Sequence, residues 1–348
     1  MRKLILCTLL LTLGLVTTQA QMPTEGVTYF LPKTALRFSF LIEKKTFTPG
    51  EYARYSERYI KTAVKSQSET TYSIVKTEMS TYALPDSAKQ FTATIDKKHS
   101  IVSVNRDQNG VIMAVNARPK QVDSPKAFVP SPKTEPINPS KYMTAEMLAA
   151  GSNAKTAELI AQEIYDIRSS KNQLSKGEAD FMPKDGEQLR IMLNNLDIQE
   201  QALLKFFQGS STVDTTELVI TYIPNKEVDR DLLFRFSPHL GMVDKDDLGG
   251  APYYIRIKDL KVIPVLELNN TPQKKNKDDV GINVNLPGKI EVTLSKEEQP
   301  ISTFETYAAQ FGRIENISGE LFGKKFTTHI ILNPVTGNVE SLQTESLE

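Results

Sequence analysis

The sequence predicts an α+β protein with two mainly antiparallel β regions and a helical pair between them. The first and last thirds of the 348-residue chain alternate apolar and polar residues, which is typical of strands with one buried face. Between these thirds, segments 156–168 and 186–207 place apolar residues every three or four positions, as on the buried face of a helix. No internal repeat with a fixed period is present.

The amino terminus has the three parts of a secretory signal peptide. Arg2 and Lys3 supply positive charge, residues 4–16 are mostly apolar, and small polar residues follow. An apolar run of about 13 residues is shorter than the roughly 20 of a membrane-spanning helix, so an uncleaved anchor is the less favoured alternative. We therefore expect cleavage before Gln21, after residues 1–20, and export of the mature protein to the periplasm or the extracellular space.

Cysteine content and net charge exclude several classes of protein. The single cysteine, Cys7, lies inside the leader, so the mature chain is not expected to be a lipoprotein or to carry disulfides, thiolate metal sites or a cysteine nucleophile. Basic and acidic residues each number 42, which gives no electrostatic reason to expect nucleic acid binding. No second long apolar stretch follows, so no transmembrane segment is expected after the leader is removed.

We predict an N-terminal β-rich domain over residues 21–115, with one helix inside it. Four segments have the alternation or the β-branched and aromatic content that strands favour: 36–42, 71–81, 101–104 and 111–115. Asn109 and Gly110 tolerate positive φ and predict a hairpin between the last two segments. The helix is predicted over 51–60, with Thr48 as its N-cap.

Residues 116–141 are predicted to be a proline-rich linker or extended surface loop, because proline fixes φ and removes a backbone donor. A C-terminal α+β domain is predicted over residues 142–348. It begins with the helical pair, whose apolar stripes are Ile160, Ile164 and Ile167 in the first helix and Leu189, Met192, Leu193, Leu196, Leu203, Leu204 and Phe207 in the second. Asp185 is the expected N-cap of the second helix, and Gly209 ends its pattern.

The last third of the chain predicts a second series of strands. Their segments are 218–223, 232–236, 253–257, 282–286, 290–294, 326–332 and 339–342. Pro287 and Gly288 predict a turn between two alternating segments. Residues 333–337 predict another turn, and the polar segment 269–281 predicts a loop or a second linker.

Histidine and aspartate residues show no spacing that predicts a metal site. His99, His239 and His329 each stand alone in the sequence, so we expect no metal and no cofactor. The segment that starts at Asp244 resembles the beginning of a calcium-binding loop. It has Ile255 where a bidentate glutamate is required, which favours a polar turn.

Serine and lysine occur twice with the spacing of a serine–lysine catalytic pair. Ser73 and Lys76 lie in a predicted strand, where this spacing separates the two side chains. Ser152 and Lys155 lie where a helix is expected to begin. The other sequence elements of such enzymes are missing, so an N-cap role for Ser152 is favoured.

Three tyrosines are weak candidates for ligand binding. Tyr52, Tyr55 and Tyr59 are three and four residues apart, so they share one face of the predicted helix. This face predicts either core packing or a stacking surface for a sugar or a peptide. Packing is the more common role, and the chain contains no tryptophan, which is the strongest stacking side chain.

The order of several short motifs resembles a family of exported Bacteroidota proteins that carry a domain of unknown function. These motifs are GVTYFLPKTAL at 26–36, PGEYARY at 49–55, IR at 167–168, MPKDGEQL at 182–189, FRFS at 234–237, GMVDKDDLGGAP at 241–252 and QFG at 310–312. The chain departs from this family before Pro287, where Asn285 and Leu286 stand in place of an aromatic residue or an arginine. The resemblance implies export and a shared architecture, but no reaction.

The sequence therefore leaves two functions open. The first is a non-enzymatic, exported protein of the cell envelope that binds a protein or a glycan partner. The alternative is a hydrolase that acts on envelope material, with Ser152 or a pair of carboxylates as its catalytic groups. An enzyme is expected to have a deep cleft lined by titratable groups, whereas a binding protein is expected to expose an apolar or aromatic patch.

Overall fold

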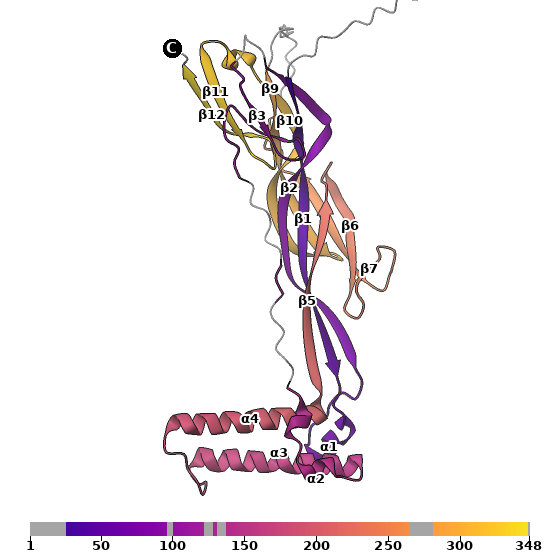
Figure 1. The fold of residues 1–348 in the computed structure, drawn as a ribbon. Coiled ribbons are helices and arrows are strands. Elements are labelled where there is room, and N and C mark those ends of the chain that lie inside the picture. Colours follow the sequence, from indigo (N-terminus) through magenta and orange to yellow (C-terminus); the bar gives the residue numbers. More distant parts are fainter. Residues whose placement is uncertain (1–25, 96–99, 122–127, 131–136, 265–280, 347–348) are drawn as a thin grey trace, which may run out of the picture.

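The computed structural model describes residues 26–95, 100–121, 128–130, 137–264 and 281–346. The predicted leader, His99 and most of the predicted loop 269–281 lie outside these ranges. The molecule is elongated, with its α-helices gathered at one end and the last described strand, residues 339–346, at the other (Figure 1). The α+β class is confirmed, with strands predominating.

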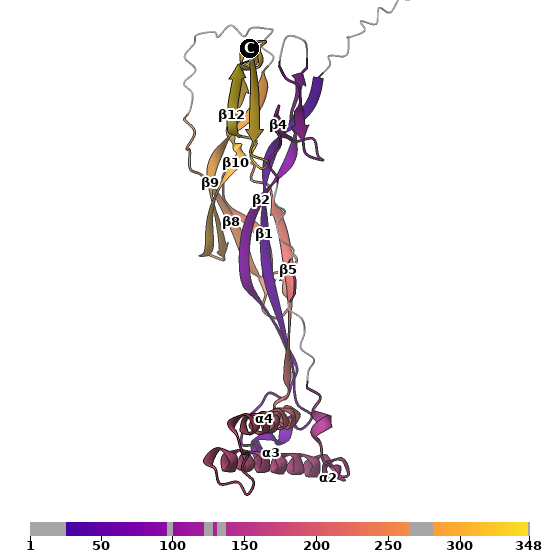
Figure 2. The same cartoon turned by 60° about the vertical axis from the view of Figure 1, so that its left-hand side comes forward.

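A long hairpin runs almost the whole length of the molecule (Figure 2). Its strands are β1 (Gly26–Thr48) and β2 (Glu69–Thr94), which contain the predicted strands 36–42 and 71–81. Both extend well beyond those segments because the two strands pair with each other along nearly their entire length. β5 (Ser210–Tyr222) pairs with β1 on its other side, so the first sheet has the order β2-β1-β5.

The second sheet has five antiparallel strands in the order β10-β9-β8-β6-β7. They are β6 (Val228–Ser237), β7 (Gly241–Val243), β8 (Ala251–Asp259), β9 (Ile282–Lys296) and β10 (Gln299–Ile317). A core lies between the first two sheets, and aromatic rings at its centre are in contact. The Phe40 and Phe234 ring centroids are 4.7 Å apart, and those of Phe234 and Tyr253 are 4.5 Å apart. This core fixes how the two sheets pack.

The third sheet joins strands from the two ends of the sequence in the order β12-β11-β4-β3. They are β3 (Val104–Arg106), β4 (Ile112–Val115), β11 (Phe326–Leu332) and β12 (Val339–Ser346), and η3 (Gly319–Phe322) precedes β11. The apolar face of this sheet forms a second core with the first residues of β1, around Tyr29 and Leu31, and the first residues of β9, Ile282 and Val284. The two long hairpins, β1–β2 and β9–β10, therefore pass through both cores.

The helical end, which we call the foot, forms a third core. Its elements are η1 (Ala53–Tyr55), α1 (Ser56–Tyr59), η2 (Pro139–Tyr142), α2 (Ala145–Leu148), α3 (Asn153–Lys176) and α4 (Gly186–Gln208). The predicted caps of α4 are confirmed, because the Gln188 N–H donates to the Asp185 side chain at 2.8 Å and Gly209 is the C-cap. Ser152 is the N-cap of α3, because its hydroxyl accepts a hydrogen bond from the Lys155 N–H at 3.3 Å.

The predicted helix over 51–60 is instead two short turns, and the predicted Thr48 cap is wrong. Thr48 is the last residue of β1, and the following backbone is held against the end of α4. The Tyr52 N–H donates to the Phe206 carbonyl at 2.8 Å, and a Cβ added at Gly50 would lie 2.3 Å from that oxygen. This close approach fixes the backbone directly before η1 begins at Ala53.

The predicted turn at Pro287 and Gly288 is also wrong, because β9 continues straight through both residues. The partner strand β10 carries four residues, 309–312, opposite Pro287 alone. Such a bulge bends the strand pair. β2 bulges in the same way with residues 86–89 opposite Leu31. A proline inside a strand thus marks the point where each hairpin passes from one core to the other.

Hydrogen bonding joins strands from before and after the predicted linker, residues 116–141. β1 pairs with β5, and β4 pairs with β11. Residues 122–127 and 131–136 of that segment lie outside the described ranges.

Among the helices of the described part, none combines the length and the apolar character that crossing a membrane requires.

Candidate functional site

The tyrosines predicted as a ligand surface divide into a buried residue and two surface residues. Tyr52 is 5% exposed and packs against Phe206, with their ring centroids 5.8 Å apart. Burial and the nearby Glu51 carboxylate raise the pKa of Tyr52. Tyr55 and Tyr59 are partly exposed, with ring centroids 6.2 Å apart. Only these two present ring surface to solvent, and their role as a ligand platform stays a prediction.

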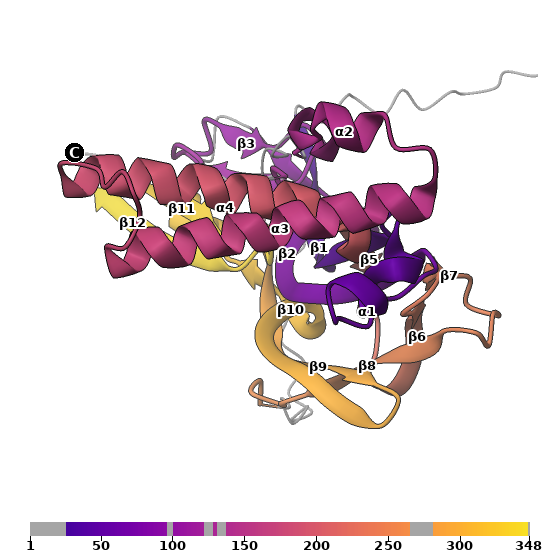
Figure 3. The ribbon, with the colours of Figure 1, turned by 90° about the horizontal axis from the view of Figure 1, so that it is seen from below.

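Arginines stack on these two rings. The Arg54 Cζ lies 4.7 Å from the Tyr55 ring centroid, and the Arg58 Cζ lies 5.2 Å from that of Tyr59. We call these four residues the arginine–tyrosine surface. Figure 3 shows α1, which carries part of it, beside α3 on the underside of the foot. The sequence pattern located the tyrosines but not the arginines, whose i, i+4 spacing was the signal that could have found them.

A second exposed feature lies where α3 and α4 connect. The inner half of this helical pair packs in the foot core, and the outer half projects to one side of the molecule (Figure 1). Four apolar side chains of the outer half are exposed to solvent: Phe181 89%, Met182 41%, Ile191 49% and Met192 40%. We call them the hairpin tip. Met192 belongs to the predicted apolar stripe, whereas Phe181 and Met182 are an apolar pair in a polar loop, a signal that the sequence analysis missed.

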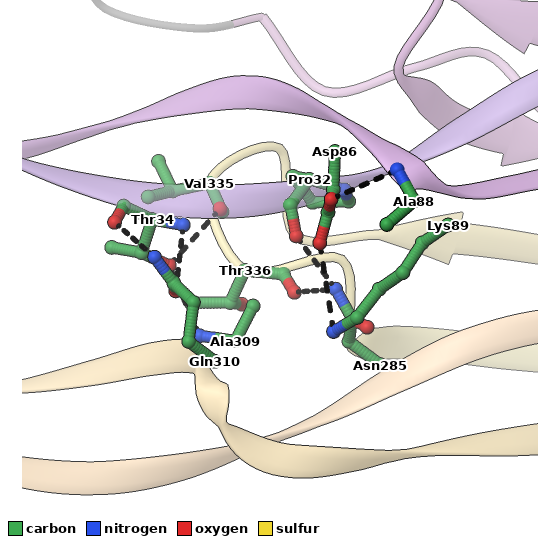
Figure 4. Close-up of polar contacts among 10 residues, drawn as sticks. All are labelled: Pro32, Thr34, Asp86, Ala88, Lys89, Asn285, Ala309, Gln310, Val335 and Thr336. Carbon is green, nitrogen blue, oxygen red and sulfur yellow. Dashed lines mark hydrogen bonds and ion pairs between the residues drawn. The ribbon is translucent and has the colours of Figure 1, made fainter. Parts of the chain in front are cut away.

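A polar cluster, which we call the waist cluster, lies between the two long hairpins where they run side by side (Figure 4). The Gln310 side-chain amide donates to the Thr34 carbonyl at 2.8 Å and accepts from the Thr34 N–H at 3.0 Å. The Thr34 hydroxyl also accepts from the Ala309 N–H at 3.2 Å. Gln310 and Ala309 belong to the β10 bulge, so this side chain replaces the backbone ladder that the bulge interrupts.

Asn285 completes the waist cluster. Its side-chain amide donates to the Pro32 and Thr336 carbonyls, each at 2.9 Å. The side chain is almost fully buried, and its Oδ1 has no hydrogen-bond partner in the described part of the chain. Nearby, Lys89 and Asp86 form a loose ion pair at 4.0 Å. The cluster joins β1, β9 and the turn before β12, so its evident role is to hold the two β cores together.

A shallow hollow on the outer face of the first sheet contains Ser39 and Glu217. The Glu217 carboxylate accepts from the Ser39 hydroxyl at 2.5 Å and from the Arg37 guanidinium at 3.0 Å. The Ser39 hydrogen bond, together with Arg37, lowers the pKa of Glu217. A carboxylate stabilised in its charged form is a weak general base, so this arrangement favours a structural ion pair over an activated serine.

The other sequence candidates for catalysis have structural partners. Lys155 forms an ion pair with Glu158 at 3.1 Å, so its ammonium is engaged away from the Ser152 hydroxyl. Asp247 accepts from the Gly249 N–H at 2.8 Å, as in a polar turn. Within the described residues, no group of three or more histidine, cysteine, aspartate or glutamate side chains is arranged to hold a metal ion.

Comparisons with known proteins place the chain in a family without giving it an activity. Searches of curated proteins and of solved structures found no match. A family model described as a domain of unknown function (DUF4831) matches residues 25–340, which include the foot and every strand except most of β12. The chain therefore belongs to the DUF4831 family.

Proposed function

We propose that this chain is an exported, non-enzymatic protein of the Bacteroidota cell envelope that binds a partner protein through its hairpin tip. Export is supported by the leader-like residues 1–20 and by the family resemblance. Its place in the periplasm or outside the cell follows from the same reasoning. The binding role is supported by the apolar side chains that the foot exposes.

The exposure of Phe181 carries this proposal. Full burial of a large apolar side chain contributes about 1.5–3 kcal/mol, and Phe181, 89% exposed, forgoes nearly all of it in the free protein. Aromatic anchors with apolar neighbours are typical of the few residues that dominate a protein interface. The connected ends of α3 and α4 also project from the foot (Figure 1), which leaves room for a partner on more than one side.

A hydrolase is less well supported, because its candidate groups have other partners. Ser152 caps a helix, and Glu217 is stabilised as a carboxylate by Arg37 and Ser39. The arrangement of these groups favours holding chain segments in place over proton transfer.

Photo-crosslinking in living cells tests the proposal. A photoreactive phenylalanine analogue replaces Phe181 in one strain and Leu248 in a control strain. Leu248 is 83% exposed and lies in the connection between β7 and β8, outside the foot. We expect a discrete crosslinked protein from position 181 and none of that mass from position 248, with mass spectrometry naming the partner.

Identical crosslinking patterns at both positions, or no crosslinked species from position 181, would contradict the proposal. The same cells test export. The mature protein should be recovered from the periplasmic or extracellular fraction with Gln21 as its first residue, and recovery from the cytoplasm with Met1 retained would overturn this part.

A further inference from the structure

We propose that the arginine–tyrosine surface is a binding site for a phosphoryl group carried on a sugar. The site uses Arg54 and Arg58 for the oxyanion and the rings of Tyr55 and Tyr59 for the sugar. It is separate from the hairpin tip, so this site and the proposed protein contact can each fail alone.

Two guanidinium groups are available to one ligand. Arg54 lies in η1 and Arg58 in the adjoining α1, and each stacks on the tyrosine that follows it in the chain. The two tyrosine ring centroids are 6.2 Å apart, so the two guanidiniums flank one pair of rings. Both side chains are exposed. In the described part of the chain, neither forms an ion pair or a hydrogen bond, and each contacts a tyrosine ring. By contrast, Arg37 and Arg190 are each bound to a glutamate.

Tyr59 holds the guanidinium that stacks on it in place. The Tyr59 hydroxyl donates to the Ala154 carbonyl at 3.4 Å, and the Tyr59 carbonyl accepts from the Tyr165 hydroxyl at 3.0 Å. The Tyr59 residue is therefore fixed to α3 from both its side chain and its backbone. An arginine that stacks on a fixed ring loses less conformational freedom when it binds a ligand.

The chemistry of the surface matches a phosphoryl group better than a neutral sugar. Planar guanidinium forks bind tetrahedral oxyanions through paired hydrogen bonds, and a phosphoryl group has enough oxygens for two forks. Residues 51–65 contain four basic and two acidic residues, of which Lys65 is paired with Glu69, whereas the whole chain is electrically balanced. The parts of the Tyr55 and Tyr59 rings that stay exposed beside the guanidiniums give a sugar ring an apolar surface to contact.

Isothermal titration of the mature chain at low ionic strength tests the site with three probes: inorganic phosphate, glucose 6-phosphate and glucose. The test variant is Arg54→Gln/Arg58→Gln. The matched control is Lys184→Gln/Arg190→Gln, which removes the same charge from exposed positions near the hairpin tip. Circular dichroism spectra establish that both variants fold as the wild type does.

We expect saturable binding of glucose 6-phosphate with a Kd in the millimolar range or below, weaker binding of phosphate and no binding of glucose. Affinity should fall about tenfold or more in the test variant and less than about twofold in the control, a difference of roughly 1.4 kcal/mol for each tenfold change. The proposal is overturned if no phosphorylated probe saturates below about 10 mM, or if glucose binds as well as glucose 6-phosphate. It is also overturned if phosphate binds more tightly than the phosphorylated sugar, or if the test variant keeps its affinity.

Discussion

Glu200 connects the two long helices of the foot, and its replacement by glutamine is predicted to loosen them. The Glu200 side chain on α4 is 9% exposed. Its two oxygens accept from the Arg168 Nε at 2.6 Å and from the Lys171 Nζ at 2.9 Å, both on α3. Lys171 also pairs with Asp197, so the interaction fixes the register of the helical pair.

The magnitude follows from the exposure of the partners. A hydrogen bond to a charged group contributes about 1.5–3 kcal/mol. The Arg168 and Lys171 side chains are 43% and 27% exposed, however, so water solvates them when the carboxylate is removed and solvent screens the pair. We therefore expect Glu200→Gln to lower the free energy of unfolding of the foot by about 1–2 kcal/mol near neutral pH.

The pKa of Glu200 determines how its contribution to the free energy of unfolding changes with pH. Burial alone raises the pKa of Glu200, but the hydrogen bonds from Lys171 and Arg168 outweigh burial and lower it. A lowered pKa in the folded state stabilises the protein above the unfolded value of about 4.3. This stabilisation is lost as the pH falls through the lower, folded value. The difference between wild type and Glu200→Gln should thus be constant above about pH 5 and shrink at more acidic pH.

Urea unfolding followed by far-ultraviolet circular dichroism measures this effect, because the helical signal comes from the foot. Glu187→Gln is the control, since Glu187 forms an ion pair on the exposed surface of α4 with Arg190, and surface pairs contribute little. A wild-type to Glu200→Gln difference that stays the same from neutral to acidic pH would refute the assignment. An equal loss in the control would do so as well.

Four further substitutions test the packing of the molecule and the role of the hairpin tip. Phe207→Ala removes a fully buried ring from the foot core and should cost about 3–5 kcal/mol. The loss should be visible in the same urea titration, and a change below about 1 kcal/mol would contradict the packing. Asn285→Ala leaves two buried carbonyls without donors, so the midpoint of thermal unfolding should fall by an amount equivalent to about 2–4 kcal/mol; an unchanged midpoint would argue against the waist cluster. Gly288→Ala puts a methyl group 2.1 Å from the Phe311 carbonyl oxygen, so the soluble yield and thermal midpoint should both drop, and normal values would mean that the bulge yields easily. Phe181→Ser should change the stability by less than about 0.5 kcal/mol while abolishing the partner crosslink from a neighbouring tip position; a large loss of stability would show that Phe181 supports the fold instead.

Local sequence patterns predicted the elements that are specified by residues close together in the chain. The three-to-four periodicity predicted both long helices, and Asp185 and Gly209 predicted the ends of α4. A cap is satisfied by side chains within a few residues, so its signal stays in the sequence. Alternation predicted most strands for the same reason, since each strand has one face on a core.

Pro287 and Gly288 adopt a different structure in the fold from the one that their local sequence favours. Together they favour a turn, yet they lie in the middle of β9. The β10 bulge passes so close that only glycine fits at position 288. The predicted helix over 51–60 was shortened by the same kind of contact, because the Phe206 carbonyl binds the backbone before it. The residues responsible are distant in the sequence, so no local pattern contains them.

For the candidate sites too, some features were visible in the sequence and others required the structure. The spacing of Tyr52, Tyr55 and Tyr59 was visible in the sequence, but the burial of Tyr52 was not. The stacking of the arginines and the exposure of Phe181 also required the structure, because both depend on which surfaces the three cores leave uncovered.

The sequence by itself determined the α+β class, the helical pair and its caps, and an amino terminus with the character of an export signal. These features arise from residues that are close together in the chain. The tertiary structure alone decided that β1 and β9 pass through two cores, and that the foot presents arginines, tyrosines and an apolar tip to solvent. Burial and strand pairing between distant segments are set by the whole molecule, since each element covers surface that another element leaves exposed.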